Sequence, residues 1–279
     1  MLLGILLIAN ILKKPETAPV SGELSVHYID VGQGDCIYIE TGGNNMLIDC
    51  GEAYKTDEAI AYLSELEVTE LDYVVGTHPH SDHMGGMSEI VKNFDIGEFI
   101  MPHLDESDIP TTKYFMNFLD EAEKCSLNVK EAQPGRKFSL GEAECEIIAP
   151  ISDNYGNTND YSVGIIIRYG KNSFIFTGDA EESAEMEMIG SGRLGHIDVY
   201  KAGHHGSDTS SSEEFLKVIS PDYAVISCGE GNSYGHPADI TLEKLGKYTD
   251  NIYRTDLCGD IVITSDGKEI EVRTERSGR

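Results

Sequence analysis

Apolar and polar residues alternate in short runs near the start of this chain. Residues 24–29 and 36–40 alternate with the period of two that is typical of a strand, and residues 46–51 form a third such run that ends in an acid and a glycine. Between 57 and 66 the apolar residues recur at helical spacing, which predicts a helix with one buried face. Residues 71–76 are mainly apolar and predict a short buried strand.

The later part of the chain follows the same plan. Further strands are predicted at 98–102, 145–150, 163–169, 173–177, 197–201 and 222–228, and helices at 87–94, 113–124, 181–189 and 240–248. Another helix follows Ser211, which stands at capping-box spacing from Glu214. Both halves run from hairpin strands through a helix and a strand to a histidine loop, without a residue-level repeat. This order predicts an α/β fold in which two sheets carry helices on their outer faces.

A histidine-rich loop follows the strand predicted at 71–76. Three histidines and a carboxylate lie close together in it, at His78, His80, Asp82 and His83. His78 and His80 are two residues apart, so an extended backbone turns both imidazoles the same way. Asp82 and His83 come after the chain has begun to turn. Imidazole and carboxylate are the usual ligands of zinc and related metals, so the loop predicts a metal site, with a plain surface loop as the alternative.

Three later stretches carry further candidate chemistry. Asp179 ends an apolar strand, where its two oxygens could bridge two metal ions; capping the next helix is the alternative. His204 and His205 follow another strand, and adjacent residues of an extended chain point to opposite sides. One of them can therefore bind metal while the other faces substrate, and a pair of ordinary surface histidines is the alternative. His236 lies in a tight loop and could stabilise a bound oxyanion or protonate a leaving group.

The charge of the chain limits its partners. Its 49 acidic residues against 21 lysines and arginines give a formal net charge of -28. Such a surface repels nucleic acid and anionic membranes at long range. A phosphate-bearing substrate then requires metal ions and a local patch that reverse the field at close range. The 279 residues and 40% hydrophobic content are enough for a packed globular core.

Two features of the chain disagree about its location. The six cysteines contain no CxxC pair and are irregularly spaced, so we interpret most as small buried residues, which favours a reducing compartment. Residues 2–12 are almost wholly apolar but shorter than the ~20 residues that span a bilayer. We interpret residues 1–22 as a clipped signal or membrane anchor with a polar linker; an amphipathic tail packed on the domain is the alternative. An extracytoplasmic or membrane-anchored protein is favoured, and a cytoplasmic one stays open.

The motifs together resemble a known family. The His-x-His-x-Asp-His pattern at residues 78–83 is similar to the signature of the metallo-β-lactamase superfamily. Further motifs resemble the ComEC-type branch (the β-lactamase-like domain of a DNA internalisation competence protein), and they lie at 30–35, 47–49, 176–179, 204–207 and 234–237. The resemblance implies a four-layer αββα sandwich over residues 23–275, with the metals at one edge of the sheets.

The resemblance also implies roles for individual residues in a site with two neighbouring metals. The implied metal ligands are His78 and His80 for the first ion, Asp82 and His83 for the second, and Asp179 as the bridge. From the second histidine loop, His205 is the expected metal ligand. His204 is then the substrate-side neighbour of His205. Asp49 is expected to fix the histidine loop, and Asp30 and Asp35 to shape the floor of the pocket.

One departure from the superfamily pattern concerns the first metal. Most members carry another histidine ligand before the bridging aspartate, but the only histidine in this interval is His103, which comes too early. The corresponding region, 157–162, resembles the polar Asn/Asp-x-Ser element of the ComEC-type branch. Asp160 or Asn159 is expected to supply an oxygen there, with Ser162 beside it. An oxygen ligand is harder, in the hard–soft acid–base sense, than an imidazole nitrogen and suits manganese, so manganese becomes a rival to zinc at this site.

The expected function is metal-assisted hydrolysis. Water made acidic by the ions attacks an electrophile, Asp82 orients that water, and His236 helps to stabilise the developing charge. The ComEC-type resemblance implies a phosphodiester substrate, single-stranded DNA included, while the net charge favours a small or terminal phosphodiester over a long DNA track. A choline-phosphate-esterase-like or other ester hydrolase is one alternative, and a non-catalytic metal-binding or nucleotide-binding module is another. The sequence indicates no protein partner.

Overall fold

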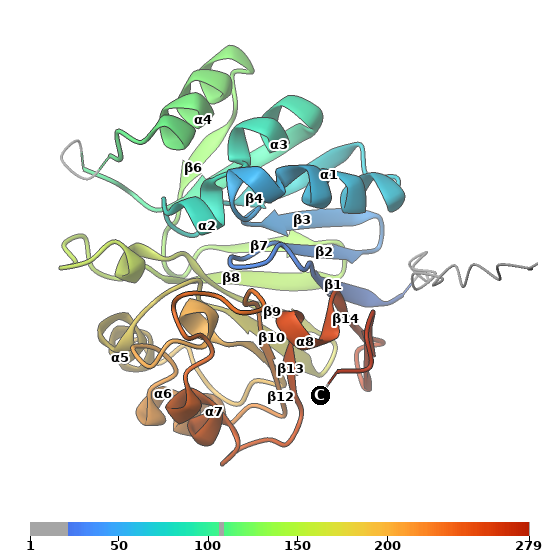
Figure 1. The fold of residues 1–279 in the computed structure, drawn as a ribbon, viewed down its shortest axis with the longest axis vertical. Coiled ribbons are helices and arrows are strands. Elements are labelled where there is room, and N and C mark those ends of the chain that lie inside the picture. The colour runs from blue at the N-terminus through green and yellow to red at the C-terminus, as the bar shows by residue number, and fades with distance from the viewer. Residues whose placement is uncertain (1–21, 106–108, 279) are drawn as a thin grey trace, which may run out of the picture.

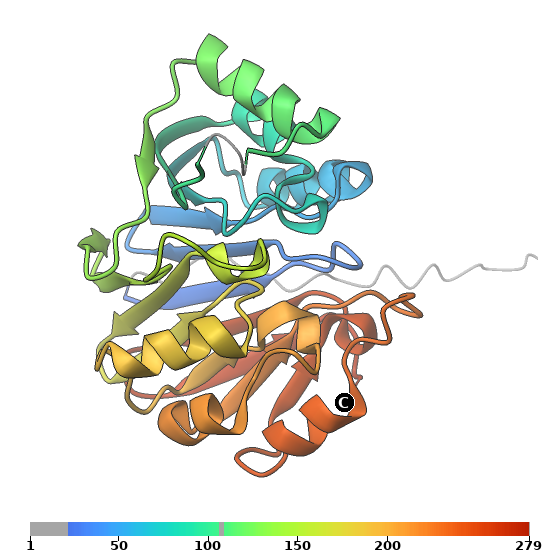
Figure 2. The same cartoon turned by 90° about the vertical axis from the view of Figure 1, so that its left-hand side faces the viewer.

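The computed structural model describes residues 22–105 and 109–278, which form four layers (Figure 1). Two β-sheets lie face to face in the middle, and helices cover the outer face of each sheet. Figure 2 shows the same layering from the side. The predicted α/β architecture, a four-layer αββα sandwich, is confirmed. The predicted signal or anchor at the N-terminus lies outside the described residues, apart from Gly22.

The first sheet has eight strands in the order β15-β14-β1-β2-β3-β4-β5-β6. They are β1 (Leu24–Tyr28), β2 (Ile37–Thr41), β3 (Asn44–Ile48), β4 (Glu70–Val75), β5 (Asp95–Met101), β6 (Val129–Glu131), β14 (Ile261–Ser265) and β15 (Ile270–Thr274). Strands β3 to β6 run parallel to one another. Their carboxyl ends therefore meet at one edge, where the loop after β4 delivers the histidine-rich segment.

The second sheet has seven strands in the order β13-β12-β11-β10-β9-β8-β7. They are β7 (Lys137–Leu140), β8 (Ala143–Ala149), β9 (Gly164–Tyr169), β10 (Asn172–Phe176), β11 (Val199–Lys201), β12 (Tyr223–Ile226) and β13 (Ile252–Arg254). Strands β10 to β13 are parallel. Asp179 follows β10 and the His204–His205 pair follows β11, so both reach the same edge of this sheet.

The alternation of side chains along the strands separates three apolar clusters. In β9, Ile165 and Ile167 point into the cluster between the two sheets, whereas Ile166 points into the cluster beneath the helices. In β2, Ile37 and Ile39 likewise face the inter-sheet cluster, and Tyr38 faces the helices of the first sheet. A shift of one residue in either strand would exchange these faces, so the pattern fixes the register.

Helices pack on the outer face of each sheet. The first sheet carries α1 (Thr56–Glu65), α2 (Ser81–Met84), α3 (Met87–Asn93) and α4 (Lys113–Lys124), and the second carries α5 (Glu182–Gly190), α6 (Glu213–Ile219) and α7 (Asp239–Leu245). The short α8 (Thr255–Cys258) follows β13, and three 3-10 turns are η1 (Ala53–Lys55), η2 (Asn159–Tyr161) and η3 (Gly203–Gly206). In α4, Phe115 and Phe118 form the buried face.

Three local predictions are corrected. Strand β6 was not predicted, because all of its residues are exposed and it has no apolar alternation. The cap of α6 is Ser212 rather than Ser211, since the Ser212 hydroxyl accepts from the Phe215 N–H at 3.2 Å while Ser211 contacts the Tyr200 hydroxyl. Asp179 does not cap α5, whose N-cap position is Glu181.

Two general expectations can also be compared with the structure. The six cysteines are all free thiols, and five of them are buried, as predicted; Cys125 is exposed. Over residues 22–105 and 109–278, no helix is both long enough and apolar enough to cross a bilayer.

Candidate metal centre

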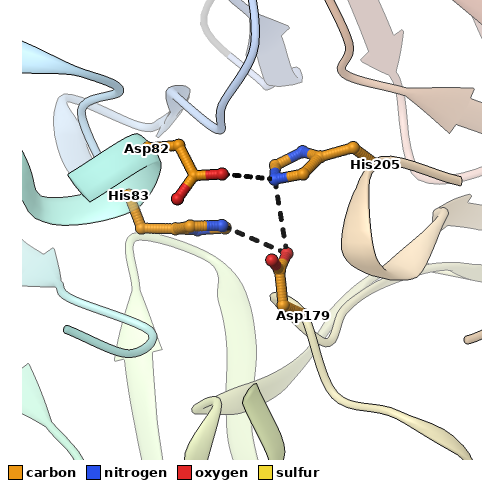
Figure 3. Close-up of side chains that lie close together, drawn as sticks. All are labelled: Asp82, His83, Asp179 and His205. Carbon is orange, nitrogen blue, oxygen red and sulfur yellow. Dashed lines mark ion pairs between the residues drawn. The ribbon is translucent and has the colours of Figure 1, made fainter. Parts of the chain in front are cut away.

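Four side chains converge where the two sheets meet. Asp82, His83, Asp179 and His205 each place one nitrogen or oxygen so that all four atoms lie within 4.8 Å of one another (Figure 3). Nε2 of His83 is 3.1 Å from Oδ1 of Asp179, and Nε2 of His205 is 3.6 Å from the same oxygen. Nε2 of His205 is also 3.3 Å from Oδ2 of Asp82. Two imidazoles thus face two carboxylates around one point.

This cluster fits a divalent metal ion. Nε2 of His83, Nε2 of His205 and Oδ1 of Asp179 are buried, yet none of them has a hydrogen-bond partner in the structure. Buried polar atoms without partners are rare because they lose their hydration without compensation. A bound cation would satisfy all three, and imidazole nitrogen with carboxylate oxygen is a donor set suited to zinc and manganese.

Close backbone contacts set the position of two of these carboxylates. Gly34 has φ of 139°, and a Cβ there would lie 2.3 Å from the carbonyl oxygen of Asp82. Gly178 has φ of 52°, and a Cβ there would lie 2.8 Å from the Ser162 hydroxyl. Only glycine fits at either position, which allows the loops that carry Asp82 and Asp179 to approach the centre.

His78 and His80 lie beside the same carboxylate. Nε2 of His78 is 3.9 Å from Oδ2 of Asp179 and 3.0 Å from Nδ1 of His80. Burial lowers the pKa of His78 well below its usual value and also lowers the pKa of His80. Both imidazoles are therefore neutral at pH 7, the form that binds metals. Asp179 lies between this pair and the other two histidines, as a bridging carboxylate would.

Asp49 orients His83. Its Oδ2 is 2.7 Å from Nδ1 of His83, and its Oδ1 accepts from the Thr77 N–H at 2.8 Å. The Thr77 hydroxyl donates to Oδ2 at 2.6 Å. A carboxylate on Nδ1 keeps the proton on that nitrogen and leaves Nε2 free to face the centre. Asp49 thus lies behind the histidine loop and contacts both His83 and Thr77.

Asp35 and Lys201 hold His205 from the other side. Nδ1 of His205 is 3.2 Å from Oδ1 of Asp35 and 3.1 Å from the Ser227 carbonyl oxygen. The Lys201 ammonium lies 2.9 Å from each oxygen of Asp35 and donates to the Ala202 carbonyl at 3.0 Å. Both side chains are almost fully buried. The sequence analysis missed Lys201; the available signal was a lysine that ends an apolar strand just before the second histidine loop.

Neighbouring charges in the cluster shift its pKa values in the direction opposite to the effect of burial. Burial alone would raise the pKa of Asp179, but His83 and His205 hold it well below its usual range. Burial alone would lower the pKa of His205, but the carboxylates of Asp179 and Asp35 raise it to about 9. Asp82 keeps a low pKa against its burial because His205 and His83 lie beside it. The carboxylates are therefore ionised at pH 7 and attract cations.

The second histidine pair has an unusual backbone. His204 and His205 have φ of 49° and 53°, in the left-handed region, which costs a non-glycine residue about 1–3 kcal/mol. The His204 N–H donates to the Gly178 carbonyl at 3.1 Å, and this contact holds the turn in place. The turn buries His205 and leaves His204 partly exposed, with its Nε2 at 3.6 Å from Oδ2 of Asp179.

His236 lies next to this turn. Its ring centroid is 5.5 Å from that of His204 and 6.4 Å from that of His205. Its Nδ1 is buried and has no hydrogen-bond partner. Burial, followed by the two neighbouring histidines, lowers the pKa of His236, so the ring is neutral at pH 7. The structure therefore brings His236 to the exposed side of the cluster.

Two candidate residues have other partners. Oδ2 of Asp30 accepts from Arg276 at 2.8 Å and Oδ1 accepts from the Gly32 N–H, so this carboxylate ties its loop to the C-terminal end of the chain. Asp160 accepts from Asn157 at 3.1 Å and from the Glu181 N–H at 2.9 Å. The structure does not bring either carboxylate into the cluster, because each is held by other hydrogen-bond partners.

Asn159 and Ser162 differ from Asp160. Oδ1 of Asn159 is buried without a hydrogen-bond partner, while its amide donates to Glu181 at 2.9 Å. The Ser162 hydroxyl lies 3.3 Å from Nδ1 of His78 and accepts from the Asp179 N–H at 3.0 Å. Ser162 therefore connects the first histidine loop with the segment that carries Asp179. His103 is exposed beside Asp105 and Glu131.

Comparison with known proteins identifies the family. The family model of the metallo-β-lactamase superfamily matches residues 29–230, a span that holds all four residues of the central cluster. The chain belongs to the metallo-β-lactamase superfamily. His236 lies beyond the matched span, so its place at this superfamily's site rests on the geometry alone.

Curated relatives and a solved structure agree with this membership. The chain is 27% identical to ComE operon protein 3 of Bacillus subtilis over 87% of its own length and 33% of the relative, so it spans about a third of that protein. It is 28% identical to exodeoxyribonuclease YycJ of Bacillus anthracis over 57% of this chain and 62% of that protein. The structure of Igni18, a metallo hydrolase from Ignicoccus hospitalis, covers 86% of this chain at a TM-score of 0.55 and 18% identity, with 98% of Igni18 covered. The resemblance to the ComEC-type branch is confirmed.

Proposed function

We propose that this protein is a metal-dependent phosphodiesterase that cleaves a small or terminal phosphodiester, with the ends of single-stranded DNA among its substrates. The observation that carries the proposal is the cluster of two imidazoles and two carboxylates, in which Nε2 of His83, Nε2 of His205 and Oδ1 of Asp179 are buried without a hydrogen-bond partner. The similarity to a relative named an exodeoxyribonuclease supports phosphodiester chemistry. The net charge of -28 supports a short substrate, because long polyanions are repelled.

The residues of the cluster have different roles in the proposed reaction. Zinc or manganese ions held by the cluster would polarise the phosphoryl group and lower the pKa of a bound water. Asp82 is the most exposed of the four, with 22% of its side chain exposed, so solvent and substrate reach the centre beside it. Its carboxylate is ionised and can accept a hydrogen bond from the attacking water. This orients the water toward phosphorus.

Two histidines lie on the side where substrate enters. Nδ1 of His204 is 3.1 Å from the Thr209 hydroxyl, which orients the ring so that Nε2 faces Asp179. His236 is neutral and beside it, so an N–H of its ring can donate to a phosphoryl oxygen or to the leaving oxygen. We assign His204 to substrate positioning and His236 to stabilisation of the charge that develops on oxygen.

The first test is the metal dependence of turnover. Chelator-treated, metal-free protein is expected to leave bis-p-nitrophenyl phosphate uncleaved, and zinc or manganese is expected to restore hydrolysis. p-Nitrophenyl phosphorylcholine and p-nitrophenyl acetate are run in parallel, because they release the same chromophore and represent the two ester-hydrolase alternatives. Metal content is measured on the same samples. Turnover by protein shown to be metal-free, or retained metal without cleavage of any substrate, would reject the phosphodiesterase and favour another chemistry or a binding module.

A second test concerns the oxygen ligand of the first ion. We propose Asn159 for this role, because its Oδ1 is buried and unpartnered while both oxygens of Asp160 accept local hydrogen bonds. Asn159→Ala is expected to weaken metal binding by at least the ~10-fold seen when supporting groups are lost. Asp160→Ala is expected to keep its metal and to lose about 1 kcal/mol of stability with its hydrogen bonds. Metal titration and urea unfolding of both variants decide the matter, and the reverse pattern would assign the oxygen to Asp160.

A further inference from the structure

Tyr234 presents an aromatic ring to solvent beside the metal centre. Its exposed fraction is 68%, although burial of an aromatic side chain contributes about 1.5–3 kcal/mol. The ring stacks on His236, with centroids 5.7 Å apart and planes inclined by 27°. The ring centroid of His236 in turn lies 5.5 Å from that of His204. A short row of rings therefore runs from His204, beside the candidate metal ligand His205, to the exposed ring of Tyr234.

The loop that carries Tyr234 is held in one conformation. Oδ1 of Asn232 accepts from the Tyr234 N–H at 3.1 Å and from the His236 N–H at 3.0 Å. The Asn232 amide donates to the Gly229 carbonyl at 2.9 Å and to the His236 carbonyl. The Gly229 N–H donates to Oε1 of Gln33 at 3.1 Å, which ties the loop to the segment before Asp35. A preorganised loop loses little conformational entropy when a ligand binds.

We propose that Tyr234 is a stacking platform for an unpaired nucleobase of the substrate. This inference rests on the proposed phosphodiesterase and names its substrate class as nucleotides with an unpaired base. His236 stacks against part of the Tyr234 ring, and the exposed fraction of 68% leaves much of that side chain accessible to a ligand. The His236 ring lies between Tyr234 and the candidate ligand His205, with centroids 5.7 Å and 6.4 Å away, so the base of a nucleotide that extends outward from the centre meets Tyr234. Stacking on an aromatic side chain contributes about 1–3 kcal/mol per base and tolerates any base.

The charge of the chain makes such an uncharged contact important. Acidic residues outnumber lysines and arginines by 49 to 21, so the chain as a whole repels a run of phosphates at long range. Affinity for a nucleotide must then come from the metal centre and from contacts that carry no charge. A platform for an unpaired base also selects against duplex, because a paired base must first be unstacked at a cost of a few kcal/mol.

A binding measurement tests the platform without any turnover. The chain contains no tryptophan, so Tyr234→Trp introduces the only indole, and stacking of a base quenches its fluorescence. The metal-loaded variant is titrated with deoxyguanosine 5′-monophosphate and with deoxyribose 5-phosphate, which has the same phosphate but no base. Saturable quenching by the nucleotide alone is expected. Equal responses to the two ligands, or none, would overturn the platform.

The control for this measurement is Val129→Trp. Val129 is the first residue of β6, the edge strand of the first sheet, and β5 separates β6 from β4, the strand that leads into the histidine loop. Val129 is 43% exposed and accepts a large side chain without repacking. Its fluorescence is expected not to respond to either ligand. Quenching of Val129→Trp by the nucleotide would mean that the signal is not specific to the loop, and the platform would again fail.

A kinetic measurement separates the platform from the proposed function. p-Nitrophenyl thymidine 5′-phosphate and methyl p-nitrophenyl phosphate share a leaving group, and the second has a methyl group in place of the nucleoside. The native protein is expected to prefer the first by about 10- to 100-fold in kcat/KM, mainly through KM. Tyr234→Ala should remove most of this preference, Tyr234→Phe should retain it, and Tyr54→Ala, at an exposed tyrosine of η1, should leave it intact.

The outcomes of these experiments are distinguishable. If the native protein cleaves both diesters equally well and Tyr234→Trp is not quenched, the platform is wrong and the phosphodiesterase stands. If neither diester is cleaved with zinc or manganese, the phosphodiesterase is wrong, and the fluorescence titration still decides whether a base binds on Tyr234. Loss of the preference in Tyr234→Phe as well would assign it to the hydroxyl rather than to stacking.

Discussion

Asp179→Ala is expected to lower the hydrolysis of bis-p-nitrophenyl phosphate by at least about a thousandfold, which corresponds to ~4 kcal/mol of activation free energy. Oδ1 of Asp179 is 3.1 Å from His83 and 3.6 Å from His205, and Oδ2 is 3.9 Å from His78. No other carboxylate of the central cluster contacts both histidine loops in this way. Its removal takes away the charge that would hold both ions together, so the expected loss is of metal as well as of turnover.

The measurement compares turnover, metal content and thermal unfolding of Asp179→Ala with those of Asp250→Ala. Asp250 is exposed and lies two residues before the N-terminal end of β13, away from the carboxyl end of that strand. The fold of Asp179→Ala is expected to survive, because the three apolar clusters do not include this side chain. Full activity of a folded Asp179→Ala variant would remove Asp179 from the centre, and a comparable loss in Asp250→Ala would show that the effect is not specific.

Local signals predicted the residues whose roles follow from position on one strand or loop. His78 and His80 are two apart and follow a buried strand, so their common direction could be read from the sequence. The same logic placed Asp179 at a strand end. Fold class was predictable for a related reason, since alternation in strands such as β9 and helical spacing in α4 depend only on neighbouring residues.

Contacts between distant segments could not be predicted in this way. Asp30 was expected near the pocket floor, but its carboxylate pairs with Arg276, which lies 246 residues later in the chain. Asp160 and Asn159 are adjacent and equally polar, and only the three-dimensional structure shows that one is satisfied locally while the other has an unpartnered oxygen. The role of Lys201 was not predicted, because a single lysine gives no sequence signal that it pairs with Asp35, 166 residues earlier.

Lys201→Met is expected to destabilise the protein by about 3–5 kcal/mol, because it leaves the Asp35 carboxylate buried without its cation. Lys201 and Asp35 are 1% and 2% exposed, so solvent cannot replace the lost partner. Urea unfolding of the metal-free protein measures this loss, and Lys244→Met is the matched control. The Lys244 ammonium is also largely buried and donates to the Ser210 carbonyl at 2.9 Å. The buried Glu185 carboxylate that it attracts keeps hydrogen bonds from the Ser211 and Ser212 N–H groups, so the loss of Lys244 should cost less.

The double variant Asp35→Leu/Lys201→Met separates stability from the positioning of His205. Replacing both members of a buried ion pair by apolar residues is often neutral, so much of the lost stability should return. Metal affinity should nevertheless stay about 10- to 100-fold below that of the native protein, because His205 keeps only the Ser227 carbonyl as a partner for Nδ1. A double variant that binds metal as tightly as the native protein would limit the pair to a structural role. Native affinity in the double variant, together with weak binding in Lys201→Met alone, would attribute the single variant's defect to misfolding rather than to the orientation of the histidine.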